Sequence, residues 1–172
     1  LKLLHDKYGI TEEDFVSAEL CAVPADKARD IGFDRSLIGS YGHDDRVCAY
    51  PSLTAILNSS DSTHSLMCIL ADKEEIGSEG NTGMQADLLV DLINEISIFF
   101  GKNPNVVRYH SKCLSADVSA SFDPNFPEVF EKNNVPMLSC GAVLTKYTGA
   151  RGKSGTNDAN AEYIGVIGAA FS

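Results

Sequence analysis

Residues 64–101, HSLMCILADKEEIGSEGNTGMQADLLVDLINEISIFFG, form a pattern of buried strand, glycine-rich loop and long helix. The run HSLMCILAD (64–72) is apolar between polar ends, which is typical of a strand covered on both faces. From 83 to 101 the apolar residues recur at helical spacing and stop at Gly101, so an amphipathic helix is expected there. A strand that feeds a helix in this way indicates an α/β fold.

The other segments continue the alternation of helices and strands. Residues 1–9 predict a helix that ends at Gly9, with Thr11 as the N-cap of the acidic stretch that follows. Residues 19–45 predict a strand and then loops, and another helix is expected to begin just after Asp45. Two further strands and a closing helix are expected at 112–122, 136–149 and 156–171.

This order predicts a three-layer α/β/α sandwich around a mixed, mostly parallel sheet. The closing helix is expected to take its cap from Thr156 or Asn157. A chain of 172 residues fits one domain.

Composition and charge exclude several classes of function. The formal net charge is -10, and Lys and Arg do not cluster, so a nucleic-acid partner is not expected. No apolar run approaches the roughly 18 residues of a membrane-spanning helix, so no membrane partner is expected either. The five cysteines are odd in number and widely spaced, which favours reduced thiols in a cytoplasmic protein.

Acidic residues occupy related places in this predicted fold. Asp44 and Asp45 lie at a junction of loop and helix, Glu74 and Glu75 follow the central strand, and Asp117 ends the next strand. Carboxyl ends of strands line the ligand crevice of an open α/β sheet. Carboxylates that meet there without Lys or Arg repel one another unless cations are bound, and two divalent metal ions would supply the charge. The alternative for any one of these acids is a helix cap or a solvated loop residue.

Four segments that contain these acids resemble the M18 family of metalloaminopeptidases, the aspartyl aminopeptidase group, in its bacterial form. They are GFDRSLIGSYGHDDRVCAY (32–50), DKEEIGSEGNTG (72–83), LSADVSASFDPNF (114–126) and GAVLTKYTGARGKSGTNDANAEY (141–163). The resemblance runs in order through essentially the whole chain. It implies an α/β/α catalytic domain of the zinc-dependent exopeptidase type, with a smaller inserted domain and dodecameric assembly.

The resemblance also implies roles for the acids. Asp44 matches the carboxylate that bridges two metal ions, with Asp45 as a supporting neighbour. Glu75 matches a ligand of one metal ion, and Asp117 a ligand of the other. The expected cofactors are two divalent ions, Zn²⁺ first, with Mn²⁺ or Co²⁺ as alternatives.

The same comparison implies a reaction. Glu74 matches the general base that takes a proton from the attacking water, and Lys146 matches a lysine near the substrate pocket. The implied activity removes N-terminal residues, preferably Asp or Glu, from peptides, in a homo-oligomeric enzyme.

Some parts of the family pattern are absent. The family also uses two histidine ligands from early and late segments, and none of the four histidines occupies a matching motif: His5, His43, His64 and His110. His43 is a candidate ligand only because it adjoins Asp44. The missing histidine ligands and the first residue, Leu1, suggest that residues 1–172 are a core fragment of the catalytic domain. Such a fragment is expected to be inactive by itself and to be without the inserted domain.

Two other interpretations stay open. One is a metal-free assembly or interaction scaffold that keeps the aminopeptidase core. The other is a related dinuclear hydrolase of the M42 or M20 type. Flanking sequence that carries the two histidines would favour the enzyme over the scaffold.

Overall fold

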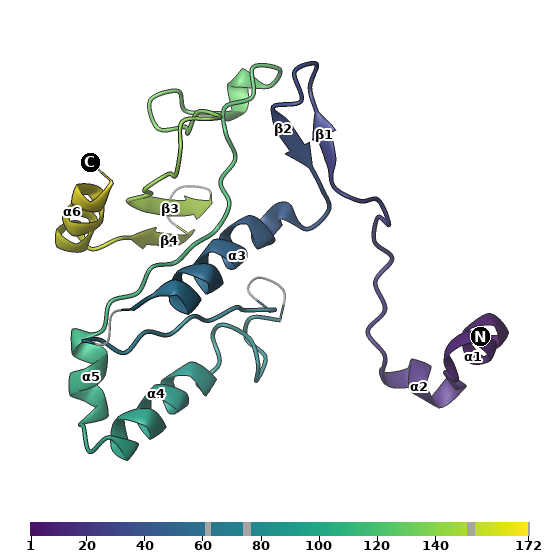
Figure 1. Ribbon diagram of the computed structural model, residues 1–172, viewed down its shortest axis with the longest axis horizontal. Coiled ribbons are helices and arrows are strands. Elements are labelled where there is room, and N and C mark those ends of the chain that lie inside the picture. Colours follow the sequence, from purple (N-terminus) through teal and green to yellow (C-terminus); the bar gives the residue numbers. More distant parts are fainter. Residues whose placement is uncertain (61–62, 74–76, 151–153, 172) are drawn as a thin grey trace. The chain divides into compact units, whose positions relative to one another are not determined.

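The computed structural model describes residues 1–60, 63–73, 77–150 and 154–171 (Figure 1). The described residues contain both helices and strands, as predicted for an α/β fold. None of the described helices combines the length and the apolar character needed to cross a membrane.

The chain divides into two compact units, Leu1–Ala116 and Asp117–Ser172. The elements of the first unit are α1 (Lys2–Tyr8), α2 (Glu12–Ser17), β1 (Arg29–Ile31), β2 (Leu37–Gly39), α3 (His43–Asn58), α4 (Leu88–Phe99) and α5 (Pro104–His110). Those of the second are the 3-10 helix η1 (Pro127–Val129), β3 (Tyr147–Ala150), β4 (Ser154–Asp158) and α6 (Ala161–Ala170).

The first two helices have the predicted ends. Gly9 has a left-handed backbone (φ 73°), and its N–H donates to the carbonyl of His5 at the end of α1. Thr11 caps α2 through a capping box, in which its hydroxyl accepts from the Asp14 N–H and the Asp14 carboxylate accepts from the Thr11 N–H. Such reciprocal bonds satisfy donors that the first helical turn leaves free.

Helices α4 and α5 form a hairpin (Figure 1). Gly101 (φ 64°) and Lys102 donate to the carbonyls of Ile98 and Ser97, the bond pair of a Schellman motif, so the helix ends where the glycine predicts. The guanidinium of Arg108 in α5 then donates to the side-chain oxygen of Asn94 at 2.8 Å. Helix α4 is shorter than predicted, because residues 83–87 form turns.

The strands of the described residues differ from the predicted sheet. They form two antiparallel pairs, β1 with β2 and β3 with β4. The predicted central strand is not assigned as a strand between residues 65 and 71. The segments 112–122 and 136–146 are also without strand assignment, and are joined by one bond from the Phe122 N–H to the Pro136 carbonyl (2.9 Å).

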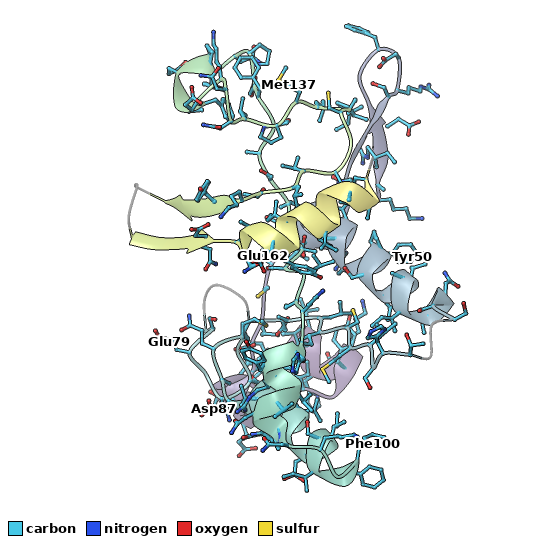
Figure 2. The ribbon with its side chains drawn as sticks, turned by 90° about the vertical axis from the view of Figure 1, so that its left-hand side faces the viewer. Tyr50, Glu79, Asp87, Phe100, Met137 and Glu162 are labelled. Carbon is cyan, nitrogen blue, oxygen red and sulfur yellow. The ribbon has the colours of Figure 1, made fainter. Side chains whose placement is uncertain are left out.

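Exposure of apolar side chains accompanies this difference. Among the described residues no hydrophobic side chain is buried, and only Ser78 and Ser97 are. In the predicted central strand, Leu66 and Leu70 are 51% and 54% exposed. Figure 2 shows side chains extending from α4 between Asp87 and Phe100. A strand needs a neighbouring strand for its backbone hydrogen bonds, and an apolar face needs another layer to cover it. The described residues do not supply these neighbours to the apolar segments.

Candidate metal centre

Asp44 and Asp45 lie side by side at the start of α3. Gly42, the N-cap, has a left-handed backbone (φ 77°), and the first regular turns follow Asp45, as predicted. Between them the backbone is not helical, with φ/ψ of -82°/107° at Asp44 and -118°/28° at Asp45, and the peptide bond between the two is cis. Each carboxylate offers an oxygen within 4.8 Å of the other's.

The two carboxylates differ in their surroundings. Asp44 is exposed, whereas Asp45 is half-buried and its Oδ1 atom is buried without a hydrogen-bond partner among the described residues. A buried carboxylate oxygen without a donor is costly, so such an atom is expected to have a partner that protein groups do not supply. A divalent cation would be such a partner, because carboxylate oxygens coordinate zinc, manganese and calcium ions. The donor set at this point therefore suits a metal ion.

Asp45 is the residue whose importance the sequence did not show. Its position after Asp44 indicated only a supporting role, since adjacency in a sequence does not reveal which carboxylate is buried. His43, the other candidate beside Asp44, is exposed at the first position of α3.

Asp117 is the first residue of the second unit. It is exposed, lies outside helices and strands, and its Oδ1 atom accepts from the N–H of Val118 at 2.7 Å. The other Asp117 oxygen, Oδ2, forms no hydrogen bond or ion pair with a described residue, so the carboxylate keeps an atom for a ligand. The predicted meeting of Asp117 with Asp44 stays a prediction.

Glu74 and Glu75 lie outside the described residues, but the chain on both sides is described. Lys73 precedes them, and its ammonium group lies 3.3 Å from the carboxylate of Glu19. The carbonyl of Lys73 accepts from the N–H of Met84 at 3.1 Å, which joins it to the far side of the glycine loop. The loop that follows the glutamates is thus attached to the residue before them.

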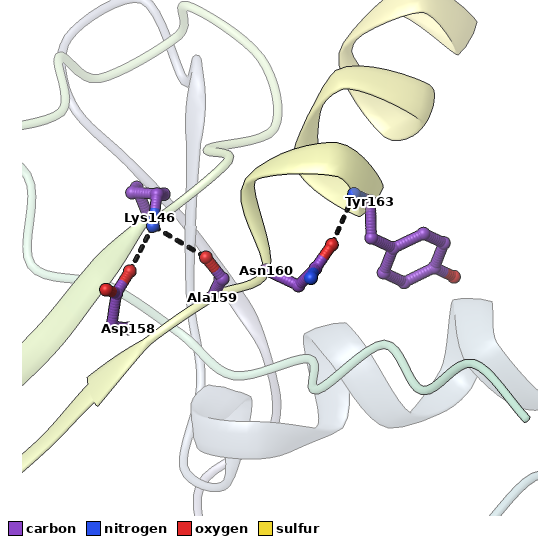
Figure 3. A network of polar contacts seen from close by, with 5 residues as sticks. All are labelled: Lys146, Asp158, Ala159, Asn160 and Tyr163. Atoms are coloured by element: carbon purple, nitrogen blue, oxygen red, sulfur yellow. Dashed lines mark hydrogen bonds and ion pairs between the residues drawn. The ribbon is translucent and has the colours of Figure 1, made fainter. Parts of the chain in front are cut away.

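Lys146 is held by two acceptors in the second unit (Figure 3). Its ammonium group forms an ion pair with Asp158 and donates to the carbonyl of Ala159 at 2.6 Å. The Ala159 N–H donates back to the Lys146 carbonyl at 2.9 Å, and the ammonium lies 4.7 Å from the centroid of the Tyr147 ring. Lys146 therefore ties β3 to the end of β4 and to the start of α6.

Helix α6 begins later than predicted. Its cap is Asn160, whose side-chain oxygen accepts from the Tyr163 N–H at 2.8 Å (Figure 3). The expected caps, Thr156 and Asn157, belong to β4 instead. The prediction of the cap was wrong because the hairpin with β3 uses these residues as a strand.

Comparison with known proteins gives a consistent family. The model of a family described as "Aminopeptidase I zinc metalloprotease (M18)" matches residues 1–170. A "Probable M18 family aminopeptidase 1" of Clostridium acetobutylicum is 52% identical over 171 residues, which cover 97% of this chain and 37% of that protein. The protein of the same name from Thermotoga maritima is 47% identical, with 97% of this chain and 38% of that protein covered.

More distant and structural relatives agree. "Vacuolar aminopeptidase 1" of Saccharomyces cerevisiae is 30% identical over 146 residues, 80% of this chain and 28% of that protein. The crystal structure of aminopeptidase I from Clostridium acetobutylicum matches with a TM-score of 0.87 and 51% identity, over 99% of this chain and 37% of that one. The chain spans little more than a third of the length of the bacterial relatives.

Proposed function

The chain belongs to the M18 family of zinc aminopeptidases, and on this premise we propose that the full-length protein removes N-terminal residues from peptides at a centre of two divalent metal ions. The observation that carries the proposal is the adjacent carboxylate pair at the start of α3, with the partnerless buried oxygen of Asp45. If the two acids only capped the helix, a buried carboxylate oxygen would be expected to accept a hydrogen bond from a backbone N–H.

The proposed ligands come from three segments. Asp44 would hold both ions, Glu75 one of them and Asp117 the other, while Asp45 would support the site from beside Asp44, where the charge of the ions would offset that of its buried Oδ1 atom. Zinc is the first candidate, because the family is described as a zinc metalloprotease. Zinc accepts carboxylate oxygens, and histidines from the rest of the protein would complete its coordination.

Glu74 is the proposed general base. Two bound zinc ions would supply Lewis acidity toward the scissile carbonyl and toward water. Glu74 accepts a proton from the attacking water and passes it to the amine that leaves. A carboxylate next to a ligand but not itself a ligand is suited to this task, and the adjacent position of Glu74 and Glu75 provides one residue for each role.

The preference for an N-terminal Asp or Glu is proposed to involve Lys146. Its cation lies in the second unit with the Asp158 carboxylate as its present partner, and it is 31% exposed. An acidic substrate side chain would compete with Asp158 for the same ammonium group. The proposed substrates are peptides with a free N-terminus.

The fold of the full-length protein is proposed to be a three-layer α/β/α sandwich with a mostly parallel sheet. The exposed apolar run at 65–71 supports this, because the remaining two thirds of a relative's length would supply strands beside it and helices above and below it. We further propose a cytoplasmic homo-oligomer, with residues 1–172 as part of its catalytic domain. Alone, this part is expected to show no hydrolysis, because it lacks the histidine ligands.

The experiment that tests the proposal compares Glu74→Gln with Glu79→Gln in the full-length protein. Both remove one carboxylate from the same segment, but Glu79 is an exposed loop residue (Figure 2). With zinc added, Glu74→Gln is expected to lower kcat on an Asp-terminated peptide by about 10²–10⁴-fold, the usual range for loss of a general base. Glu79→Gln is expected to keep wild-type kcat.

Two results would contradict the proposal. One is a wild-type full-length protein that hydrolyses no N-terminal residue in the presence of Zn²⁺, Mn²⁺ or Co²⁺, which would favour a non-catalytic scaffold. The other is Glu74→Gln with wild-type kcat. For the 172-residue chain alone, turnover that Glu74→Gln abolishes would overturn the expectation that this part is inactive.

A further inference from the structure

The glycine loop behind the two glutamates is a closed, hydrogen-bonded structure. Three successive turns run through it, with N–H donors at Gly80, Gly83 and Ala86 bonded to the carbonyls three residues earlier at 2.9, 3.0 and 3.1 Å. A fourth bond closes the loop across its base, from the Gln85 N–H to the Ser78 carbonyl at 3.0 Å. Ser78 is 5% exposed, one of the two buried side chains among the described residues.

Closure depends on the absence of a side chain at Gly83. A Cβ atom there would lie 2.2 Å from the Ser78 carbonyl oxygen and 2.5 Å from that of Gly77. Both are backbone atoms, which cannot turn aside as the end of a side chain can. Gly83 does not have a positive φ, so its requirement for glycine comes from this close approach and not from its own backbone conformation.

The closed loop also fixes the residues on either side of 74–76. The Met84 N–H, next to Gly83, donates to the Lys73 carbonyl at 3.1 Å. The Lys73 side chain lies against Gly77, 3.4 Å from where a Cβ would stand, and its ammonium group reaches Glu19. The two ends of the glutamate segment are therefore attached to one backbone network.

We propose that Gly83 is a positioning residue of the peptidase: its close approach to Ser78 keeps Lys73 and Gly77, the described residues on either side of 74–76, in one backbone network, and catalysis and metal binding depend on that network. The inference rests on the proposed function of the two glutamates in that segment. Gly83 has no side chain to bind substrate or metal, so the proposed role acts through the backbone. Gly83 thus permits a close backbone contact, a different role from the flexibility that glycines usually confer.

The test uses Gly83→Ala and Gly80→Ala in the full-length protein. The two substitutions add the same methyl group to the same loop, but a Cβ at Gly80 meets only one backbone oxygen, that of Gly77 at 3.0 Å. Because displacement of a catalytic group by about 1 Å can cost about 10²-fold, Gly83→Ala is expected to lower kcat by that order with little change in KM. Gly80→Ala is expected to have a smaller effect, because its single contact is relieved by a shift of a few tenths of an ångström.

A second readout does not depend on turnover. Competition with a chelator measures zinc affinity, and Gly83→Ala is expected to weaken it by at least about tenfold, as loss of a support for a metal ligand does. Folded Gly83→Ala protein with wild-type kcat and zinc affinity would overturn the inference. An inactive wild type would reject the proposed function alone, and the zinc titration would still decide the role of Gly83.

Amide hydrogen exchange of the wild type covers the case in which Gly83→Ala does not fold. The N–H groups of Met84 and Gln85 are expected to exchange more slowly than that of Thr82, for which no backbone acceptor is found among the described residues. Equal exchange at the three positions would show that the loop is open in solution and would overturn the inference.

Discussion

The ammonium group of Lys146 forms an ion pair with the carboxylate of Asp158, the last residue of β4. The same group donates to the Ala159 carbonyl, one residue before the cap of α6 (Figure 3). One side chain therefore joins two strands and a helix. This arrangement bears directly on the proposal that Lys146 meets an acidic substrate, because the cation already has a carboxylate partner.

Substitution of each partner separates the two roles of Lys146. Lys146→Met and Asp158→Asn both remove the ion pair, but only Lys146→Met removes the cation. If Lys146 binds an acidic substrate, Lys146→Met is expected to raise KM for an Asp-terminated peptide by about tenfold relative to an Ala-terminated one, the loss of one charge-assisted bond. Asp158→Asn should lower that ratio, because the substrate carboxylate then competes with no protein carboxylate for the ammonium group. If the two variants change KM equally for both peptides, Lys146 only stabilises the β3–β4 hairpin and does not bind the substrate.

The cap of α6 gives a prediction about local stability. Asn160→Ala removes the acceptor of the Tyr163 N–H and is expected to lower the free energy of opening the first turn of α6 by about 1 kcal/mol, a typical cost for an N-cap. Asn157→Ala, at the position that the sequence favoured, is the matched control. Amide exchange at Tyr163 and Ile164 measures both variants. If Asn157→Ala speeds exchange more than Asn160→Ala does, Asn157 caps α6, as the sequence predicted.

Helix ends were predictable because their signals are local. Gly9, Thr11 and Gly101 mark ends of α1, α2 and α4 in the structure as they do in the sequence. Each acts through bonds within a few residues of itself, and these need no distant part of the chain. The short helix α5 was not predicted, although Asn103 and Pro104 are its cap and first residue. It followed too closely on the long apolar helix to be recognised separately.

Strands were less predictable, because a strand is defined by its partners. The apolar run at 65–71 shows what would be buried, but not what pairs with it, and the described residues give it no ladder. This chain covers 37% of the length of the Clostridium acetobutylicum relative, and partner strands would come from the part that it does not cover. The β1–β2 hairpin was not predicted because its strands have only three residues each and are mostly exposed, so they show no pattern of buried residues.

The candidate site was predictable as a set of residue types but not as an arrangement. The acids at the predicted strand ends and helix start indicated metal chemistry, and the structure adds that one oxygen of Asp45 is buried without a hydrogen-bond partner among the described residues. The closure of the glycine loop through Gly83 could not be predicted, because a glycine pattern alone does not distinguish a flexible segment from a close backbone contact.

Acid is expected to loosen helix α2. The backbone N–H of Thr11, and then its hydroxyl, donate to the Asp14 carboxylate and lower the pKa of Asp14 from its ordinary value of 3.8. The pKa of Asp14 is lower in the folded state, so the capping box stabilises α2 fully at pH values above the pKa of the unfolded chain. This contribution is lost as the pH falls through the folded-state pKa.

The ¹³Cα shifts of Glu12–Ser17 measure this effect between about pH 6 and about pH 2. In the wild type they should move toward random-coil values at the acid end. Asp14→Asn should remove most of that change, since the titrating carboxylate is gone. Helical shifts that persist at the lowest pH in the wild type would show that the carboxylate contributes nothing to the helix.

Substitutions at the start of α3 distinguish the two aspartates as zinc partners. In the full-length protein, Asp44→Asn is expected to abolish zinc binding at one or both sites, because a shared ligand is lost. Asp45→Asn is expected to lower the affinity for zinc by about 10–100-fold, the usual effect of losing a residue that supports a metal ligand. Asp91→Asn, an exposed residue of α4, changes the net charge equally and serves as the control.

Metal analysis after dialysis and chelator competition give the two measurements, stoichiometry and affinity. If Asp45→Asn loses zinc as completely as Asp44→Asn, the partnerless Oδ1 atom of Asp45 is itself a metal ligand, and the two aspartates share the coordination. If neither substitution changes stoichiometry or affinity relative to Asp91→Asn, the carboxylate pair does not bind metal, and the centre proposed for this chain is wrong.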